Sequence, residues 1–128
     1  MGRIVAQVKI TNPLDKSKVL EFSALVDTGA SYLTLPLAWR DKLGEMDDVR
    51  RVTAQVADQR SVEAQIAGPV RIQIENFPAA YTEILFLDMG DAPERYEPLL
   101  GHLPLQQSQI SIDMVNHCLF PVKYVDCK

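Results

Sequence analysis

The chain has 128 residues, of which 47% are hydrophobic and 23% charged, and this balance excludes a largely disordered protein. The length suits a single domain over residues 1–128 with a core of useful size. The formal net charge of −4, without any basic patch, argues against a nucleic-acid partner.

The N-terminal part predicts a β-hairpin over residues 3–26. Apolar side chains recur there at every second position, which is the period of a strand with one buried face: Ile4, Ala6, Val8 and Ile10. Asn12-Pro13-Leu14-Asp15 has the composition of a turn, and Val19–Val26 then gives the returning strand. The apolar run stops at Asp27-Thr28-Gly29.

A short helix is expected after this break. Residues 32–35 first resume extended character, and the helix follows over Leu37–Leu43. Pro36 suits a first helical turn, because an N–H group there has no intrahelical partner in any case. Gly44 is placed to cap the C-terminal end, and residues 45–48 form a polar loop.

The central part predicts more strands. Val49–Ala57 and Ser61–Ala67 flank a hairpin tip at Asp58-Gln59-Arg60. Gly68-Pro69 predicts a turn before a further strand, Val70–Ile74. After another turn at residues 76–78, the remaining segments are a strand over Tyr81–Leu87 and an acidic, proline-containing loop over residues 89–97.

The C-terminal part closes the predicted fold. Leu99-Leu100-Gly101 is a short apolar element, and His102–Gln107 has room for one or two helical turns, which Pro104 limits. Residues 109–114 and 118–122 are expected to be closing strands. The sequence therefore predicts an all-β class domain, mostly strands, with a principal helix near residue 40 and a shorter one near residue 105.

Several functional classes are not expected. Cys118 and Cys127 are too few for a disulfide framework, so a reducing cytoplasm is the simpler setting. His117 and Cys118 are adjacent, and neighbouring side chains on a strand point to opposite faces, so no metal site is expected. No cofactor motif, signal peptide or membrane-spanning run is present either.

Asp27 is the candidate for chemistry, and two interpretations of it are open. It emerges at the end of a buried strand, and Gly29 permits backbone angles and close approaches that other residues do not. A carboxylate on such a turn is held rigidly at the edge of a core. Aspartate is also common in turns for purely structural reasons, so the local pattern alone favours a turn-capping role.

The wider pattern resembles the aspartic peptidases. Leu25-Val26-Asp27-Thr28-Gly29-Ala30-Ser31 is similar to their active-site motif, and Pro98-Leu99-Leu100-Gly101-His102 resembles the hydrophobic-hydrophobic-Gly element that accompanies it. A hairpin lies between the two, where the family keeps its flap. Residues 100–113 look like the helix and closing strand of retropepsin-like domains, notably those of the DNA-damage-inducible ubiquitin-shuttle proteins.

The resemblance implies a retropepsin-like closed β-barrel with one lobe per chain and an endopeptidase activity. This chemistry needs two carboxylates that share one proton, as in the aspartic-protease dyad that serves as the standard example. The chain has a single Asp-Thr-Gly and no room for a second lobe, so the second aspartate must come from a second copy. A homodimer acting on a peptide or protein substrate is therefore implied.

Roles for the active-site loop follow from the same resemblance. Asp27 is the expected base and acid, and Thr28 is expected to join the two loops across the dimer axis. Gly29 permits close approach to the substrate. Ala30 lacks the hydroxyl that pepsin-like relatives often carry, so we expect a weakly acidic optimum, roughly pH 4.5 to 6.5, above the range of pepsin-like dyads.

The flap, roughly residues 52–65, is expected to close over the peptide and exclude water. Its tip residues are the expected substrate contacts: Ala57, Asp58, Gln59 and Arg60. The tip has no glycine, where many relatives have one or more, and His102 stands where many carry Asp or Arg. We expect His102 to be a surface or capping residue. A catalytically weak or inactive dimeric peptide-binding module on the same fold is the competing interpretation.

Overall fold

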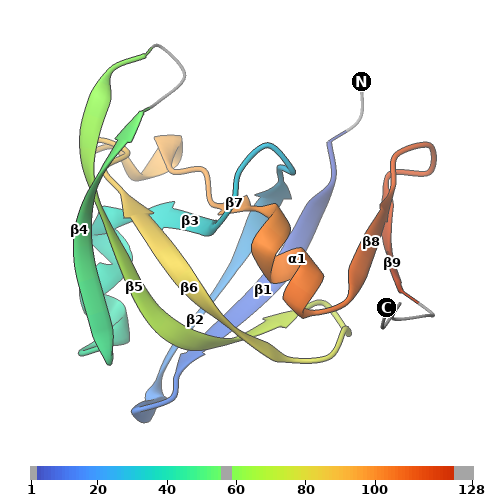
Figure 1. The fold of residues 1–128 in the computed structure, drawn as a ribbon, viewed down its shortest axis with the longest axis horizontal. Helices are drawn as coiled ribbons and strands as arrows, with labels where there is room; N and C mark the ends of the chain where they lie inside the picture. The colour runs from blue at the N-terminus through green and yellow to red at the C-terminus, as the bar shows by residue number, and fades with distance from the viewer. Residues whose placement is uncertain (1–2, 56–58, 123–128) are drawn as a thin grey trace, which may run out of the picture.

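A computed structural model of the chain describes residues 3–55 and 59–122. Figure 1 shows a body of strands with one projecting hairpin on the left and a smaller one on the right. The strands are β1 (Val5–Asn12), β2 (Asp15–Val26), β3 (Leu33–Pro36), β4 (Asp48–Gln55), β5 (Ser61–Ile74), β6 (Ala80–Leu87), β7 (Leu99–Leu100), β8 (Ile110–Asp113) and β9 (Cys118–Pro121). The helical segments are η1 (Leu37–Leu43), η2 (Pro93–Arg95) and α1 (His102–Gln107).

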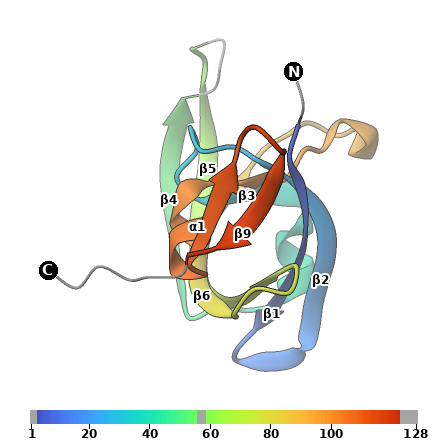
Figure 2. The same ribbon diagram turned by 90° about the vertical axis from the view of Figure 1, so that its right-hand side faces the viewer.

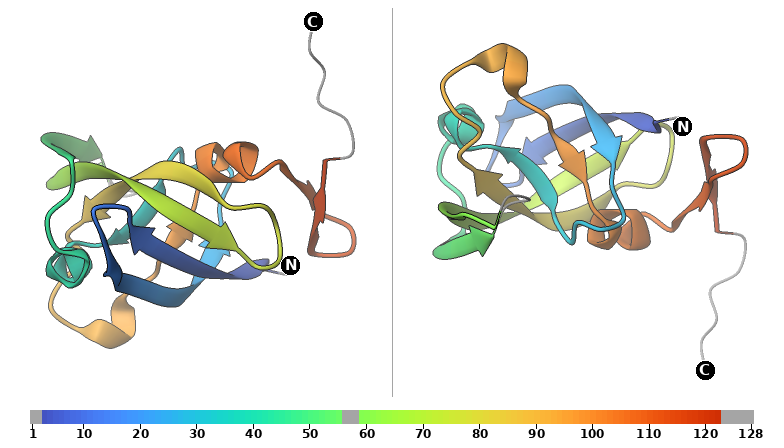
Figure 3. Two further views of the ribbon diagram at one scale, coloured as in Figure 1. Left: turned by 90° about the horizontal axis from the view of Figure 1, so that it is seen from below. Right: turned by 90° about the horizontal axis from the view of Figure 1, so that it is seen from above.

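The main sheet closes into a barrel. Its strand order is β1-β2-β7-β3-β6-β5-β4, and β1 also pairs with β5, so the ring runs from β1 through β5 and leaves β4 outside it. Figure 3 shows this ring from below and from above. The mostly β class and the closed barrel predicted from the sequence are thereby confirmed.

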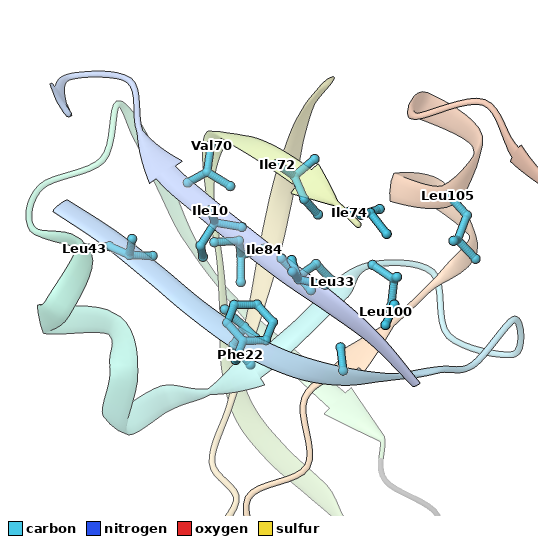
Figure 4. Close-up of a cluster of buried hydrophobic side chains, with 14 of the residues drawn as sticks. Ile10, Phe22, Leu33, Leu43, Val70, Ile72, Ile74, Ile84, Leu100 and Leu105 are labelled. Carbon is cyan, nitrogen blue, oxygen red and sulfur yellow. The ribbon is translucent and has the colours of Figure 1, made fainter. Parts of the chain in front are cut away.

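The N-terminal hairpin forms as predicted, with β2 starting earlier than expected, at Asp15. Ala6 pairs with Ala24 and Val8 with Phe22. Cross-strand partners share a face of the sheet, so the alternating apolar side chains of β1 all point into the barrel. Ile4, Ala6, Val8 and Ile10 are buried, and Figure 4 shows the central part of this core.

The expected turn at Gly68-Pro69 is wrong. β5 continues through both residues as one long strand, and its register with β6 shifts between Ala67 and Val70. The shift is a β-bulge, which bends the strand so that its first half pairs with β4 and its second half with β1. Gly68 has a φ of 145°, a backbone conformation that favours glycine.

Two of the three helical segments, η1 and α1, occur where the sequence predicted them, whereas η2 lies in the stretch that was expected to be a loop. Leu37–Leu43 is a 3₁₀ helix, and the shorter His102–Gln107 is the α-helix of the described residues. Gly44 ends the first with a φ of 71°, and its N–H donates to the Asp41 carbonyl. The buried Asn12 side chain also donates to the carbonyls of Leu43 and Glu45, which fixes the end of η1 to the first hairpin.

The β4–β5 hairpin projects beyond the barrel, as the flap interpretation requires (Figure 1). Arg50 of β4 donates to Glu83 of β6 at 3.0 Å, which joins the base of the hairpin to the barrel. The hydrogen bond to Glu83 raises the pKa of Arg50. Residues 56–58 of the tip lie outside the described part of the chain.

The β8–β9 hairpin forms a separate two-stranded sheet beyond α1 (Figure 2). Its turn is held by Asp113, whose carboxylate accepts hydrogen bonds from the Asn116 side chain and from the N–H groups of Asn116 and Val115. These bonds, the side-chain bond first, lower the pKa of Asp113. Their contribution to the stability of the turn is therefore lost when the pH falls through that lowered value.

Candidate active site

Asp27 leaves the barrel where β2 meets β7. These two strands run parallel, with Leu25 opposite Leu99 and Val26 opposite Leu100. The N–H of Asp27 then donates to the Leu100 carbonyl at 3.0 Å. The aspartate backbone is thus a direct extension of the paired strand, and the barrel fixes its position.

The loop that follows Asp27 is held by the segment after β7. Gly101 N donates to the Tyr32 carbonyl at 3.1 Å, and Leu103 N donates to the Ser31 carbonyl at 3.0 Å. The N–H and the Nδ1 of His102 each lie 3.0 Å from the Ala30 carbonyl. Because three consecutive residues hold three consecutive carbonyls, the loop has little freedom to move.

The two segments touch so closely that a glycine is required at position 101. A Cβ placed there would lie 2.5 Å from the Tyr32 carbonyl oxygen and 2.7 Å from that of Ala30. The φ of Gly101 is −78°, which any residue can adopt. Glycine is therefore required by the lack of space and not by the backbone conformation. The sequence predicted that the two motifs belong together, and the structure brings them into contact.

The carboxylate of Asp27 also makes the turn contact that the structural interpretation predicts. Its Oδ1 accepts from Gly29 N at 3.0 Å, and Ala30 N donates to its backbone carbonyl at 3.1 Å. Asp27 itself is only half-buried, while Thr28 and Gly29 are exposed. The carboxylate therefore caps its own turn, in a residue that stays partly accessible to solvent.

A largely apolar row runs across the outside of the barrel from this site. Its members are register partners on successive strands: Leu25, Leu99, Thr34, Leu85 and Ile66. The residues next to them, such as Leu100 and Ile84, form the buried core, so the row must face away from it. The row is not an open surface, because Thr34 and Ile66 are buried.

Two of the four predicted flap contacts lie among the described residues. Gln59 and Arg60 are exposed at the tip of the β4–β5 hairpin, and Ala57 and Asp58 fall outside the described residues. Gln59 has a φ of 66°, so a non-glycine residue takes a left-handed conformation in this tip. The tip needs such a conformation, and the chain supplies it without glycine.

His102 was expected at the surface or as a cap, and its ring lies against the Ala30 carbonyl. That contact was not predictable from the sequence, since it joins residues 72 positions apart. The sequence did place His102 next to the Leu-Leu-Gly element, and this position indicated that it lies near the Asp27 loop. Among residues 3–55 and 59–122, no group of three or more His, Cys, Asp or Glu side chains is placed to hold a metal ion.

The sequence and the fold both match known proteins. The family model described as aspartyl protease matches residues 6–102, a range that includes both the Asp27 loop and Gly101. A solved structure of EIAV protease complexed with the inhibitor HBY-793 matches with a TM-score of 0.58 and 23% sequence identity, and the match covers 82% of this chain and 86% of that one. No curated protein sequence matches.

Proposed function

The chain belongs to the aspartyl protease family, with the retropepsin-like fold, and we propose that it is an endopeptidase whose active form is a homodimer. Asp27 of each copy would supply one of the two catalytic carboxylates. The observation that carries the proposal is the Asp27 loop, which the segment from Leu100 to Leu103 fastens while the carboxylate remains half-exposed.

The proposed reaction is the hydrolysis of a peptide bond by water. One Asp27 carboxylate takes a proton from the water, and its protonated mate donates a hydrogen bond to the substrate carbonyl. The hydroxyl of the water adds to the carbonyl carbon, and collapse of the resulting tetrahedral species breaks the C–N bond. A proton passes to the departing amine, so the products are a carboxylate end and an amine end.

The direct test combines activity with mass in solution. Purified protein is incubated with a mixture of peptides, new ends are identified by mass spectrometry, and the mass is measured by sedimentation. We expect cleavage that pepstatin, a transition-state mimic for aspartic peptidases, suppresses, together with a larger dimer fraction when pepstatin is bound. Hydrolysis by a species that sediments only as a monomer would reject the proposed mechanism.

A dimeric peptide-binding module without catalysis is the second candidate. It is favoured by Gln59, whose side chain stands at the flap tip where a glycine would give more freedom. Such a module would bind extended peptides with the same affinity before and after Asp27 is replaced, and it would release them unchanged. Mass analysis of bound peptides separates the two functions.

The β8–β9 hairpin supports the homodimer. Met114 is 69% and Val115 86% exposed, and these two neighbours are the most exposed large apolar side chains of the described residues. A cavity of about 170 Å³ lies between the hairpin and the active-site loop, and Thr28, Ile112 and Met114 are among its lining residues. An apolar side chain of a second copy would find partners there.

We predict that Met114→Ser weakens the dimer while Leu14→Ser does not. Leu14, at the turn between β1 and β2, is 63% exposed and therefore a matched control. Loss of one buried apolar side chain costs about 1.5–3 kcal/mol, so the dissociation constant should rise about tenfold or more. Sedimentation over a range of concentrations measures it, and equal constants for the two variants would contradict the assignment of the surface.

Ala30→Ser is predicted to move the pH–rate profile to lower pH. A hydroxyl at this position can donate to the charged carboxylate, and donation to the charged form favours ionisation. The singly protonated pair would then exist at lower pH than in the wild type. Rates measured from about pH 3 to 8 with both proteins, a span around the known dyad values, give the comparison. An unmoved acidic limb would show that residue 30 does not reach the carboxylate.

A further inference from the structure

A cavity of about 170 Å³ adjoins the active-site loop, but a larger one, of about 340 Å³, lies at the root of the β4–β5 hairpin. Its lining comes from β4, from β5 and from Leu37, the first residue of η1. No residue of the Asp27 loop is among the lining residues. Its volume lies within the range of small-ligand sites.

The polar lining forms a compact set on one face of the hairpin. Arg51 is opposite Gln65, and Thr53 is opposite Glu63, two residues further along each strand. Cross-strand partners and residues two apart share a face, so all four side chains lie on the same side. Within the described part of the chain, no ion pair or side-chain hydrogen bond is formed by Arg51 or Glu63.

One polar atom of this set is buried without a partner. The Oε1 of Gln65 is inaccessible to solvent and accepts no hydrogen bond from the described residues. Gln65 is the register partner of Phe86, which is fully buried, so its amide lies at the edge of the core. An unmet acceptor of this kind is destabilising unless something donates to it.

We propose that this cavity is a second binding site, for a short peptide that ends in a free carboxylate. The guanidinium of Arg51 would hold the carboxylate with paired hydrogen bonds. Rotation of the half-buried Gln65 side chain would bring its Oε1 to a peptide N–H, and Glu63 would accept from a further N–H. Leu37 supplies apolar lining for the terminal side chain, together with the backbone of Val52 and Ala64, whose side chains point to the other face of the hairpin.

Occupation of the site would affect the flap, because the same residues form the root of that hairpin. A ligand joined to Arg51 on β4 and to Gln65 on β5 would fix both strands relative to η1. Hydrolysis of a peptide bond produces a new carboxylate end, so the site would respond to product. This last step rests on the proposed peptidase function, whereas binding itself does not.

The test uses the full chain carrying Asp27→Asn, so that no ligand is consumed. N-acetyl-alanyl-leucine, as the free acid and as the C-terminal amide, is titrated into ¹⁵N-labelled protein. We expect the acid to shift the amide signals of residues 37, 51–53 and 63–65, and the amide form to bind about tenfold more weakly or worse, since one charged hydrogen-bond pair is lost. Slower hydrogen exchange over β4 and β5 should accompany binding of the acid.

Two variants and a control decide the proposal. Arg51→Gln and Gln65→Leu should each weaken binding of the acid about tenfold or more. Arg71→Gln, on the other half of β5, should leave it unchanged. Gln65→Leu also removes the unmet acceptor, so its melting temperature should not fall. Each of four results would overturn the proposal, whether or not the protein is a peptidase. They are equal affinity for the acid and the amide, signal shifts centred on the Asp27 loop, a loss of affinity in Arg71→Gln equal to that in the two variants, and no binding up to the solubility limit of the peptide.

Discussion

Replacing Asp27 with Asn is expected to abolish peptide hydrolysis while leaving the fold and the dimer intact. Asparagine keeps Oδ1, so the hydrogen bond from Gly29 N is retained, but it cannot take up or share a proton. General acid–base chemistry contributes about a hundredfold to ten-thousandfold, and the two copies lose both groups together, so we expect a loss of at least about a thousandfold. Cleavage rates of the purified variant measure the loss of activity, and its thermal unfolding shows whether the fold is kept.

Asp88 provides a control of matched geometry. Its Oδ1 accepts from Gly90 N at 2.9 Å, just as Asp27 Oδ1 accepts from Gly29 N at 3.0 Å. Asp88→Asn therefore tests the effect of altering an Asp-x-Gly turn without altering the proposed site. We expect full activity from it. Retained hydrolysis by Asp27→Asn would mean that the Asp27 carboxylate is not the catalytic group, and an equal loss in both variants would mean that the loss is not specific to Asp27.

Strands such as β1 and β6 were predictable because one face of each is buried. Period two in β1 is a direct consequence of its pairing with β2 on one side and β5 on the other, with the core beneath. The same rule failed at Gly68-Pro69. These two residues usually end a strand, but here a β-bulge absorbs them and β5 runs on. Local composition does not distinguish a turn from a bend inside a continuous strand.

The arrangement of the strands in space was not accessible from local patterns. β7 has two residues, yet it lies between β2 and β3 and leads into the segment that holds the Asp27 loop. Its place depends on hydrogen bonds between segments about 75 residues apart, such as Asp27 N to the Leu100 carbonyl. Only the resemblance to a known family predicted that these motifs meet.

Within the candidate site, the side chain was predictable and its supports were not. Asp27 is marked by the motif around it, whereas the groups that fix its loop are the carbonyls of Ala30, Ser31 and Tyr32. Every residue carries a carbonyl, so the sequence gives no sign of which ones are used. Gly101 is the exception, because a glycine can be read directly from the sequence and indicates a position where another segment can approach closely.

Gly101→Ala is expected to be among the most damaging single substitutions in the chain. The new Cβ would lie 2.5 Å from the Tyr32 carbonyl oxygen and 2.7 Å from the Ser31 carbonyl carbon. These are backbone atoms, so no rotamer change relieves the contact, and the loop must move away from β7. We expect a loss of about 3 kcal/mol or more in the free energy of unfolding, a large share of the usual total.

Gly90→Ala separates crowding from backbone strain. Gly90 has a φ of 84°, but a Cβ added to it would meet no atom within 4 Å, whereas Gly101 has an ordinary φ and no room. The control should cost about 1–2 kcal/mol, the usual penalty for a residue with a Cβ in the left-handed region. Urea unfolding followed by Trp39 fluorescence gives both values. If Gly101→Ala were no more costly than Gly90→Ala, the segment after β7 would not be the rigid support of the Asp27 loop, and the proposed geometry of the site would fall with it.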